Sequence, residues 1–249
     1  MDVQRYLDRI GYAGALDTSI DTLRALHRAH MLSVPFENLD IHLGRPIVLD
    51  QAALFEKIVE GRRGGFCYEL NGLFQELLRR VGFQVAMLSA GVARADGGFG
   101  PDLDHMALMV TLDEVWLADV GFGDSFLEPI RLDDSIVTED PTGHYRIEVR
   151  EGHRVMLRRR NESQWTPQYR FMLQPRELPE YREMCLYHQT SPESSFTRKR
   201  VCSLATEAGR ITLSEMTFIS TEGEIRQQRE LADHAEYRAA LLKYFGIVL

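Results

Sequence analysis

The sequence predicts an α+β protein whose helices come first and whose strands follow. Helical periodicity dominates residues 1–81. Strand-like runs separated by turns fill residues 84–172, and they return at 199–230 before a helical stretch at 231–245. Helices that precede strands, instead of alternating with them, favour layers in which the two are segregated.

The helical part contains two predicted caps and one clear helix. Asp21 and Asp50 each precede an apolar pattern of helical period, and we expect them to cap helices. The clearest helix follows Cys67 and ends at Gly82, the residue type that most often terminates a helix. Its apolar stripe consists of Leu70, Leu73, Phe74, Leu77, Leu78 and Val81.

The middle of the chain predicts hairpins. Met106–Leu112 and Val115–Val120 flank a short acidic turn and should pair with each other. Tyr145–Val149 and Val155–Leu157 predict a second hairpin. A further strand at 168–173 and a helix at 178–188 follow.

Composition excludes several classes of function. The 249 residues carry 29 Lys and Arg against 37 Asp and Glu, and a net charge of −8 argues against nucleic acid as a partner. Three cysteines without C-x-x-C spacing exclude a disulfide framework and a cysteine-rich metal site. No apolar run is long enough to cross a membrane, and no signal-like stretch opens the chain. We therefore expect a cytoplasmic protein with no metal and no membrane partner, and a homodimer is left open.

Cys67 is a candidate nucleophile. It follows Gly64, Gly65 and Phe66 and stands at the start of the clearest helix. The positive end of the helix dipole should lower the thiol pKa, and the glycines should allow a sharp turn and close approach of a substrate. The alternative is a buried structural cysteine, which is the role we expect for the other two cysteines.

His105 and Asp119 are candidates for the base and its orienting acceptor. His105 opens one strand of the first predicted hairpin and Asp119 ends the other, so pairing brings them to the same end. An aspartate among apolar residues requires a partner, although a carboxylate in a turn is the alternative. His27 and His30 are expected to be surface or satisfied core residues.

Two further segments have open interpretations. Gly121-Phe122-Gly123 is either a tight turn or a set of exposed N–H groups facing an oxyanion or phosphate. The run Arg158–Arg160 is either solvated or in contact with an anionic ligand such as a nucleotide phosphate. Asp124, directly after the glycine pair, works against phosphate binding there.

Four segments resemble motifs of the arylamine N-acetyltransferase family. Arg63–Asn71 (RGGFCYELN) resembles the nucleophile motif, and Val34–Asp40 (VPFENLD) resembles the motif upstream of it. Asp119–Gly123 (DVGFG) looks like the aspartate-glycine motif, and Tyr6–Tyr12 is similar to the family's opening segment. His105 lies between cysteine and aspartate, as in the family. The resemblance covers most of residues 5–125 and is diffuse after about 130.

The resemblance implies a three-part fold and a site. The parts are a helical bundle at 1–82 with the nucleophile, a β-barrel at 83–190 with histidine and aspartate, and an α/β lid at 191–249. It implies a triad in which acetyl-CoA acetylates the thiol and an arylamine, hydrazine or arylhydroxylamine then takes the acetyl group. The triad consists of Cys67, His105 and Asp119.

The resemblance also assigns supporting residues. The Cys67 amide and the Gly121 region would form the oxyanion hole, and Glu37 would form a structural ion pair with Arg63. The implied acceptor pocket contains Phe36, Val92 and Phe122, and the implied coenzyme A site contains Gly121 and Gly123.

Three other functions stay open on the sequence alone. The first is an amide synthase that closes a macrolactam from a carrier-bound acyl chain. The second is a hydrolase in which water accepts the acyl group from the same Cys-His-Asp set. The third is a binding protein without catalysis, which the intact Cys67, His105 and Asp119 disfavour.

Overall fold

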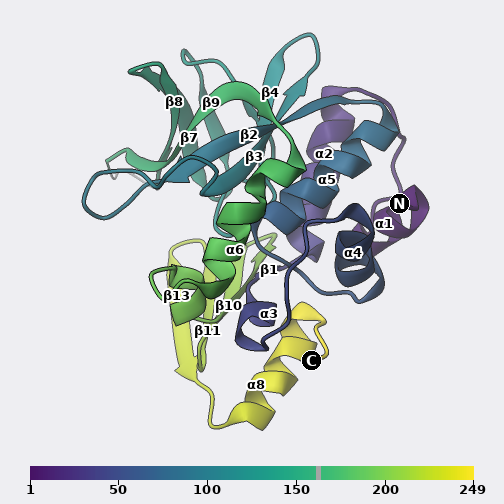
Figure 1. Cartoon of the computed structure of the whole chain (residues 1–249), viewed down its shortest axis with the longest axis vertical. Helices are drawn as coiled ribbons and strands as arrows, with labels where there is room; N and C mark the ends of the chain where they lie inside the picture. Colours follow the sequence, from purple (N-terminus) through teal and green to yellow (C-terminus); the bar gives the residue numbers. More distant parts are fainter. Residues whose placement is uncertain (161–163) are drawn as a thin grey trace.

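The computed structural model describes residues 1–160 and 164–249. Helices from the N-terminal third lie beside an eight-stranded sheet, and a five-stranded sheet with helix α8 lies at the opposite end of the molecule (Figure 1). The predicted α+β class is confirmed, with helices and strands segregated along the chain. None of the helices in the described ranges is long and apolar enough to cross a membrane.

Three helices of the helical region, α1, α2 and α4, begin at side-chain caps. The Ser19 side chain accepts the Thr22 N–H and caps α2, so the prediction that Asp21 caps this helix is wrong; Asp21 lies in the first turn. The prediction for Asp50 is confirmed, because its carboxylate accepts two N–H groups of α4. The helices are α1 (Val3–Ile10), α2 (Ile20–Ser33), α3 (Leu39–His42), α4 (Gln51–Phe55) with a π-helical turn η1 (Glu56–Glu60), and α5 (Cys67–Val81).

Helix α5 is the centre of the molecule. It runs from Cys67 to Val81, and Gly82 ends it in the left-handed conformation at a φ of 114°. The predicted apolar stripe packs into the core, and Glu69, Asn71 and Gln75 on the other faces are buried as well. A helix that is covered on nearly all sides fixes the positions of the elements packed around it.

The eight-stranded sheet is antiparallel and nearly closes into a barrel. Both predicted hairpins are confirmed as β3–β4 and β7–β8. The Asp140 carboxylate at the end of β6 accepts the N–H groups of Leu127 and Glu128, just before β5, so the two edge strands approach each other. In sheet order the strands are β5 (Ile130–Arg131), β4 (Val115–Ala118), β3 (His105–Thr111), β2 (Gln84–Val92), β9 (Thr166–Arg176), β8 (His153–Arg159), β7 (Gly143–Arg150) and β6 (Val137–Asp140).

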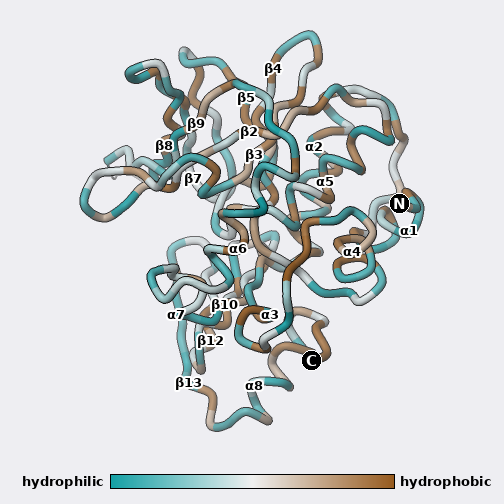
Figure 2. Tube along the Cα trace, viewed as in Figure 1, coloured by the Kyte–Doolittle hydropathy of each residue, from teal (hydrophilic) through white to brown (hydrophobic). Residues whose placement is uncertain are grey.

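The five-stranded sheet contains one strand from the N-terminal part of the chain and four from the C-terminal part. Its first strand, β1 (Phe36–Glu37), comes from the helical region and pairs with β10. The opposite edge strand β13 is exposed and largely hydrophilic (Figure 2). The remaining strands are β10 (Val201–Thr206), β11 (Gly209–Ser214), β12 (Thr217–Glu222) and β13 (Ile225–Glu230). The remaining helices are η2 (Leu178–Tyr181), α6 (Arg182–Thr190), α7 (Ser195–Arg198), α8 (His234–Ala240) and the π-turn η3 (Leu241–Phe245).

The burial of α5 leads to a stability prediction. Leu70 is fully buried on this helix, and we expect Leu70→Ala to lower the free energy of unfolding by about 2–5 kcal/mol because a cavity replaces the side chain. Urea unfolding followed by circular dichroism measures the change. The control is Leu186→Ala on α6, where the leucine is 58% exposed and the change should stay within about 0.5 kcal/mol. Equal effects of the two substitutions would contradict the central role of α5.

Candidate active site

Cys67 starts α5 because the preceding backbone is held against the helical region. The Glu37 N–H donates to the carbonyl of Gly65 at 2.8 Å. A side chain at Gly64 would place its Cβ 1.9 Å from the carbonyl oxygen of Pro35. Gly64 thus admits the Pro35 backbone and Gly65 the Glu69 side chain, so both glycines have a structural role. The Glu69 carboxylate accepts the Phe66 N–H and fixes the first turn.

A buried ionic network lies beneath this turn. Arg63 donates to Glu37 at 2.8 Å and to Asp40 at 3.0 Å, which confirms the expected Glu37–Arg63 ion pair. Lys57 bridges Asp40 and Glu69 with two contacts of 2.7 Å. Each buried charge has an opposite partner, which is the condition under which such charges are tolerated. The network connects the segment before Cys67 to the first turn of α5.

His105 and Asp119 form the predicted pair. His105 Nε2 lies 2.7 Å from Asp119 Oδ2, and both side chains are buried. The β3–β4 register aligns Leu108 with Ala118, so the two residues are diagonal neighbours at the end of the hairpin. Burial would raise the pKa of Asp119, but His105 and two further hydrogen bonds hold it below its usual range. An ionised Asp119 therefore keeps the proton of His105 on Nε2 and leaves Nδ1 as the acceptor.

Asn71 connects this pair to the helix that carries the thiol. Its Nδ2 donates to Asp119 Oδ1 at 2.9 Å and to the Met106 carbonyl at 2.6 Å. Its Oδ1 accepts the Val120 N–H at 3.0 Å. Asn71 follows Cys67 by four residues and so shares its helix face. No role was predicted for Asn71 from the sequence, although its spacing of four residues from Cys67 could have identified it.

His27 supports Asp119 from the opposite side. The Asp119 N–H donates to His27 Nε2 at 3.1 Å, and His27 Nδ1 lies 2.8 Å from the Leu127 carbonyl. The ring stacks on Phe126 and is fully buried. Burial lowers the pKa of His27, so the neutral ring donates to Leu127 and accepts from Asp119. The prediction of a satisfied core histidine is confirmed, and its partner is the backbone of the candidate orienting residue.

The environment of the Cys67 thiol differs from the prediction. Burial raises its pKa well above the ordinary value, while the Met106 backbone opposes the rise through a hydrogen bond to the thiol. The prediction that the start of the helix lowers this pKa is therefore wrong for the unliganded protein, because desolvation outweighs the dipole. Met106, whose backbone bonds the thiol, directly follows His105 in the chain. A thiolate at Cys67 requires an adjacent cation, and His105 is the candidate.

Aromatic side chains surround the imidazole. The rings of Phe122 and Tyr169 lie 5.2 and 5.1 Å from that of His105. Phe36 lies against Gly123, where a Cβ would approach its ring to 3.2 Å, and Val92 pairs with Tyr169 across β2 and β9. Phe122 therefore lies against His105, while Phe36 and Val92 are neighbours of Gly123 and Tyr169. No role was predicted for Tyr169, whose position depends on the pairing of strands far apart in the chain.

Gly121 is packed directly against α5. A Cβ at this position would lie 2.7 Å from both Asn71 Nδ2 and the Cα of Cys67. The Gly121 N–H donates to Asp119 Oδ1 at 3.0 Å. Within the Gly121 region expected to help form the oxyanion hole, this N–H therefore already has a partner. The Cys67 N–H, in the first turn of α5, has no acceptor within the helix and is the better candidate.

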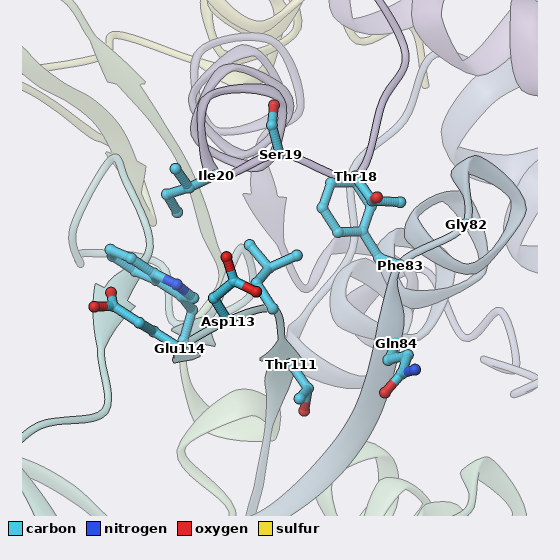
Figure 3. A pocket seen from close by; sticks show the side chains of 11 residues that line it. Thr18, Ser19, Ile20, Gly82, Phe83, Gln84, Thr111, Asp113 and Glu114 are labelled. Carbon is cyan, nitrogen blue, oxygen red and sulfur yellow. The ribbon is translucent and has the colours of Figure 1, made fainter.

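One hollow lies away from this cluster. It measures about 670 Å³ and is walled by Thr18–Ile20, the start of β2 and the β3–β4 turn (Figure 3). Neither Cys67, His105 nor Asp119 lines it. Within residues 1–160 and 164–249, no group of three or more His, Cys, Asp or Glu side chains is arranged to hold a metal ion.

The coupling of thiol and imidazole can be tested by alkylation. We expect iodoacetamide to modify Cys67 near neutral pH in the unaltered protein, because His105 accepts its proton. In His105→Gln, burial alone should keep the thiol protonated, so modification should require a pH above about 8.5. Peptide mass spectrometry measures the rate against pH, with the buried Cys185 and Cys202 as internal controls. Coincident pH profiles would show that His105 does not activate the thiol.

The role of His27 leads to a stability prediction. His27→Leu leaves the Asp119 N–H and the Leu127 carbonyl buried without partners. We expect the free energy of unfolding to fall by about 1–3 kcal/mol for each group left unsatisfied. Urea unfolding measures it, and His234→Leu at the exposed start of α8 is the control. An unchanged stability of His27→Leu would show that these hydrogen bonds are dispensable.

Comparisons with known proteins agree with this geometry. A family model described as N-acetyltransferase matches residues 19–249. An arylamine N-acetyltransferase of Escherichia coli is 38% identical, over 98% of this chain and 88% of its own. The proansamycin X synthase of Amycolatopsis mediterranei is 30% identical, over 96% and 94%. The structure of a Mycobacterium marinum arylamine N-acetyltransferase in complex with CoA superposes with a TM-score of 0.92 at 32% identity, covering 99% of this chain and 93% of that one. A match of this extent shows that the chain belongs to the arylamine N-acetyltransferase family.

Proposed function

We propose that this protein is an acetyl-CoA-dependent arylamine N-acetyltransferase that works through a thioester on Cys67. The observation that carries the proposal is the buried His105–Asp119 pair, which Asn71 ties to the helix that begins at the buried Cys67, in a chain of this family. Cys67 is the nucleophile, His105 is the general base and acid, and Asp119 orients the imidazole.

The first half-reaction loads the enzyme. His105 Nδ1 takes the proton of Cys67, and the thiolate attacks the carbonyl carbon of acetyl-CoA. The tetrahedral adduct collapses, the bond from the carbonyl carbon to the coenzyme sulfur breaks, and the coenzyme leaves as a thiol with the proton held by His105. One thioester replaces another, so the exchange is nearly balanced in free energy and needs no other energy source.

The second half-reaction transfers the acetyl group. The acceptor is an arylamine, a hydrazine or an arylhydroxylamine, whose neutral nitrogen attacks the acetyl-cysteine. His105 removes a proton from the nitrogen and returns it to the departing sulfur of Cys67. The products are an amide and the free enzyme; an arylhydroxylamine that attacks through oxygen gives the corresponding ester. Asp119 stabilises the imidazolium that forms in each half-reaction.

The surroundings of the triad supply binding and stabilisation. The Cys67 N–H would donate to the oxyanion of each tetrahedral adduct. We assign the acceptor pocket to Phe36, Val92 and Phe122, whose side chains are partly exposed. The coenzyme would pass along Gly121 and Gly123, because Gly121 lies directly against Cys67 at the start of α5. We divide the chain functionally into a bundle at 1–82, a barrel at 83–190 and a lid at 191–249.

Intact-mass spectrometry tests the proposed function. With acetyl-CoA alone we expect a single acetyl adduct of about 42 Da per chain, stable until 4-anisidine or hydralazine is added. Cys67→Ala should form no adduct. Cys185→Ser, which alters another buried cysteine, should still form it.

The alternative functions predict different masses. An adduct that decays equally fast without amine would indicate a hydrolase. No adduct with acetyl-CoA, but loading from a longer carrier-bound acyl chain, would indicate an amide synthase. An adduct retained by Cys67→Ala would show that the nucleophile is assigned wrongly.

A further inference from the structure

Three arginines converge on Asp124, the residue directly after Gly121-Phe122-Gly123. Arg158 Nη1 lies 3.2 Å from Asp124 Oδ1, and Arg210 Nε lies 3.4 Å from the same oxygen. Arg160 pairs with Asp124 Oδ2. Arg158 lies on β8 of the barrel-like sheet and Arg210 on β11 of the five-stranded sheet, so the arginine cluster bridges the two sheets.

The charges of the arginine cluster do not cancel. Among residues 1–160 and 164–249, Arg158, Arg160 and Arg210 contribute three positive charges around the single carboxylate of Asp124. The nearby Asp140 carboxylate is turned towards the N–H groups of Leu127 and Thr142. The chain as a whole has a net charge of −8, which makes this local positive excess distinctive. In the described part of the chain, these arginines outnumber the carboxylate, which favours phosphate binding in spite of the negative charge of Asp124.

The excess charge is partly removed from water. The side chains of Arg158 and Arg210 are 7% and 13% exposed. Arg158 is held by the carbonyls of Thr142 and Asp124, whereas Nη2 of Arg210 is buried and has no hydrogen-bond partner among the described residues. A guanidinium that is desolvated and incompletely paired gains free energy when an anion approaches.

The arginine cluster borders a hollow near the triad. The hollow measures about 230 Å³, and its lining is polar: Asp124, Arg158, Arg160, Thr166 and Gln168. Gln168 immediately precedes Tyr169, whose ring contacts both Phe122 and His105. Asp124 is only two residues from Phe122, so about 7 Å of extended backbone separates the arginine cluster from the wall of the site.

We propose that the arginine cluster binds a phosphate group of the acyl donor, so that it selects coenzyme A over donors that lack phosphate. The inference rests on the proposed function, because it assigns the donor of that reaction. Guanidinium groups bind phosphate oxygens in pairs of parallel hydrogen bonds, and the fixed Asp124 holds Arg158 and Arg210 in place while Arg160 remains 57% exposed.

Donor selectivity is the measurement that tests this assignment. The ratio of kcat/KM for acetyl-CoA to kcat/KM for acetyl-pantetheine, which lacks phosphate, isolates the phosphate contribution. We expect Arg160→Gln to lower this ratio about tenfold, mainly through a higher KM for acetyl-CoA, and Arg210→Gln to lower it at least as much. Arg150→Gln is the matched control, because Arg150 is half-exposed on β7 and pairs with Glu148 away from the site. Should Arg210→Gln fail to fold, the exposed Arg160 still provides the test.

Direct binding separates this inference from the proposed function. Calorimetry with coenzyme A and with adenosine 3′,5′-bisphosphate should show weaker binding to Arg160→Gln than to the unaltered protein, and binding that weakens with added salt. This result would support the arginine cluster even if no acetyl group were transferred to Cys67. An unchanged donor ratio together with unchanged coenzyme binding in both variants would reduce the arginine cluster to a structural bridge between the sheets and overturn the inference.

Discussion

The buried carboxylate of Asp119 is the constraint on which the rest of the site depends. It is removed from water, so its charge persists only because His105, Asn71 and the Gly121 N–H all bind it. Each of these partners belongs to a different segment of the chain, and His27 holds the Asp119 backbone from a fourth. Satisfying one charge therefore brings β3, α5, the 119–121 loop and α2 into a single arrangement.

Pairing of buried charges also holds the segment that carries the thiol. Five charged side chains beneath the Gly64–Gly65 turn pair with one another and anchor the start of α5, while the glycines allow the Pro35–Glu37 backbone to come close. Burial makes the free thiol a weak acid, so a reactive thiolate at Cys67 requires a base or a cation that offsets the desolvation. A nucleophile that stays protonated until its partner acts is protected from indiscriminate reaction with electrophiles.

Electrostatics divides the site into two zones. Around the triad, neutral aromatic rings cover a compensated pair of charges, an environment suited to an uncharged amine and a thioester. Beyond the Gly121–Gly123 turn, the arginines around Asp124 produce a positive zone between the two sheets. The turn joins these zones over a few residues, which matches a donor whose reactive thioester is uncharged and whose other end carries phosphates.

Sequence alone determined the elements and most of the chemistry. The periodicity after Cys67, the glycine at position 82 and the hairpin pattern around residues 113–114 predicted α5 and the β3–β4 pair because these signals are local. The same hairpin predicted that His105 and Asp119 meet. The tertiary structure alone decided that Asn71 and His27 support Asp119 and that Tyr169 lies against His105. It also decided the signs of two electrostatic effects, the raised pKa of Cys67 and the positive surroundings of Asp124. These depend on burial and on contacts between residues far apart in the chain, and local sequence patterns carry no information about either.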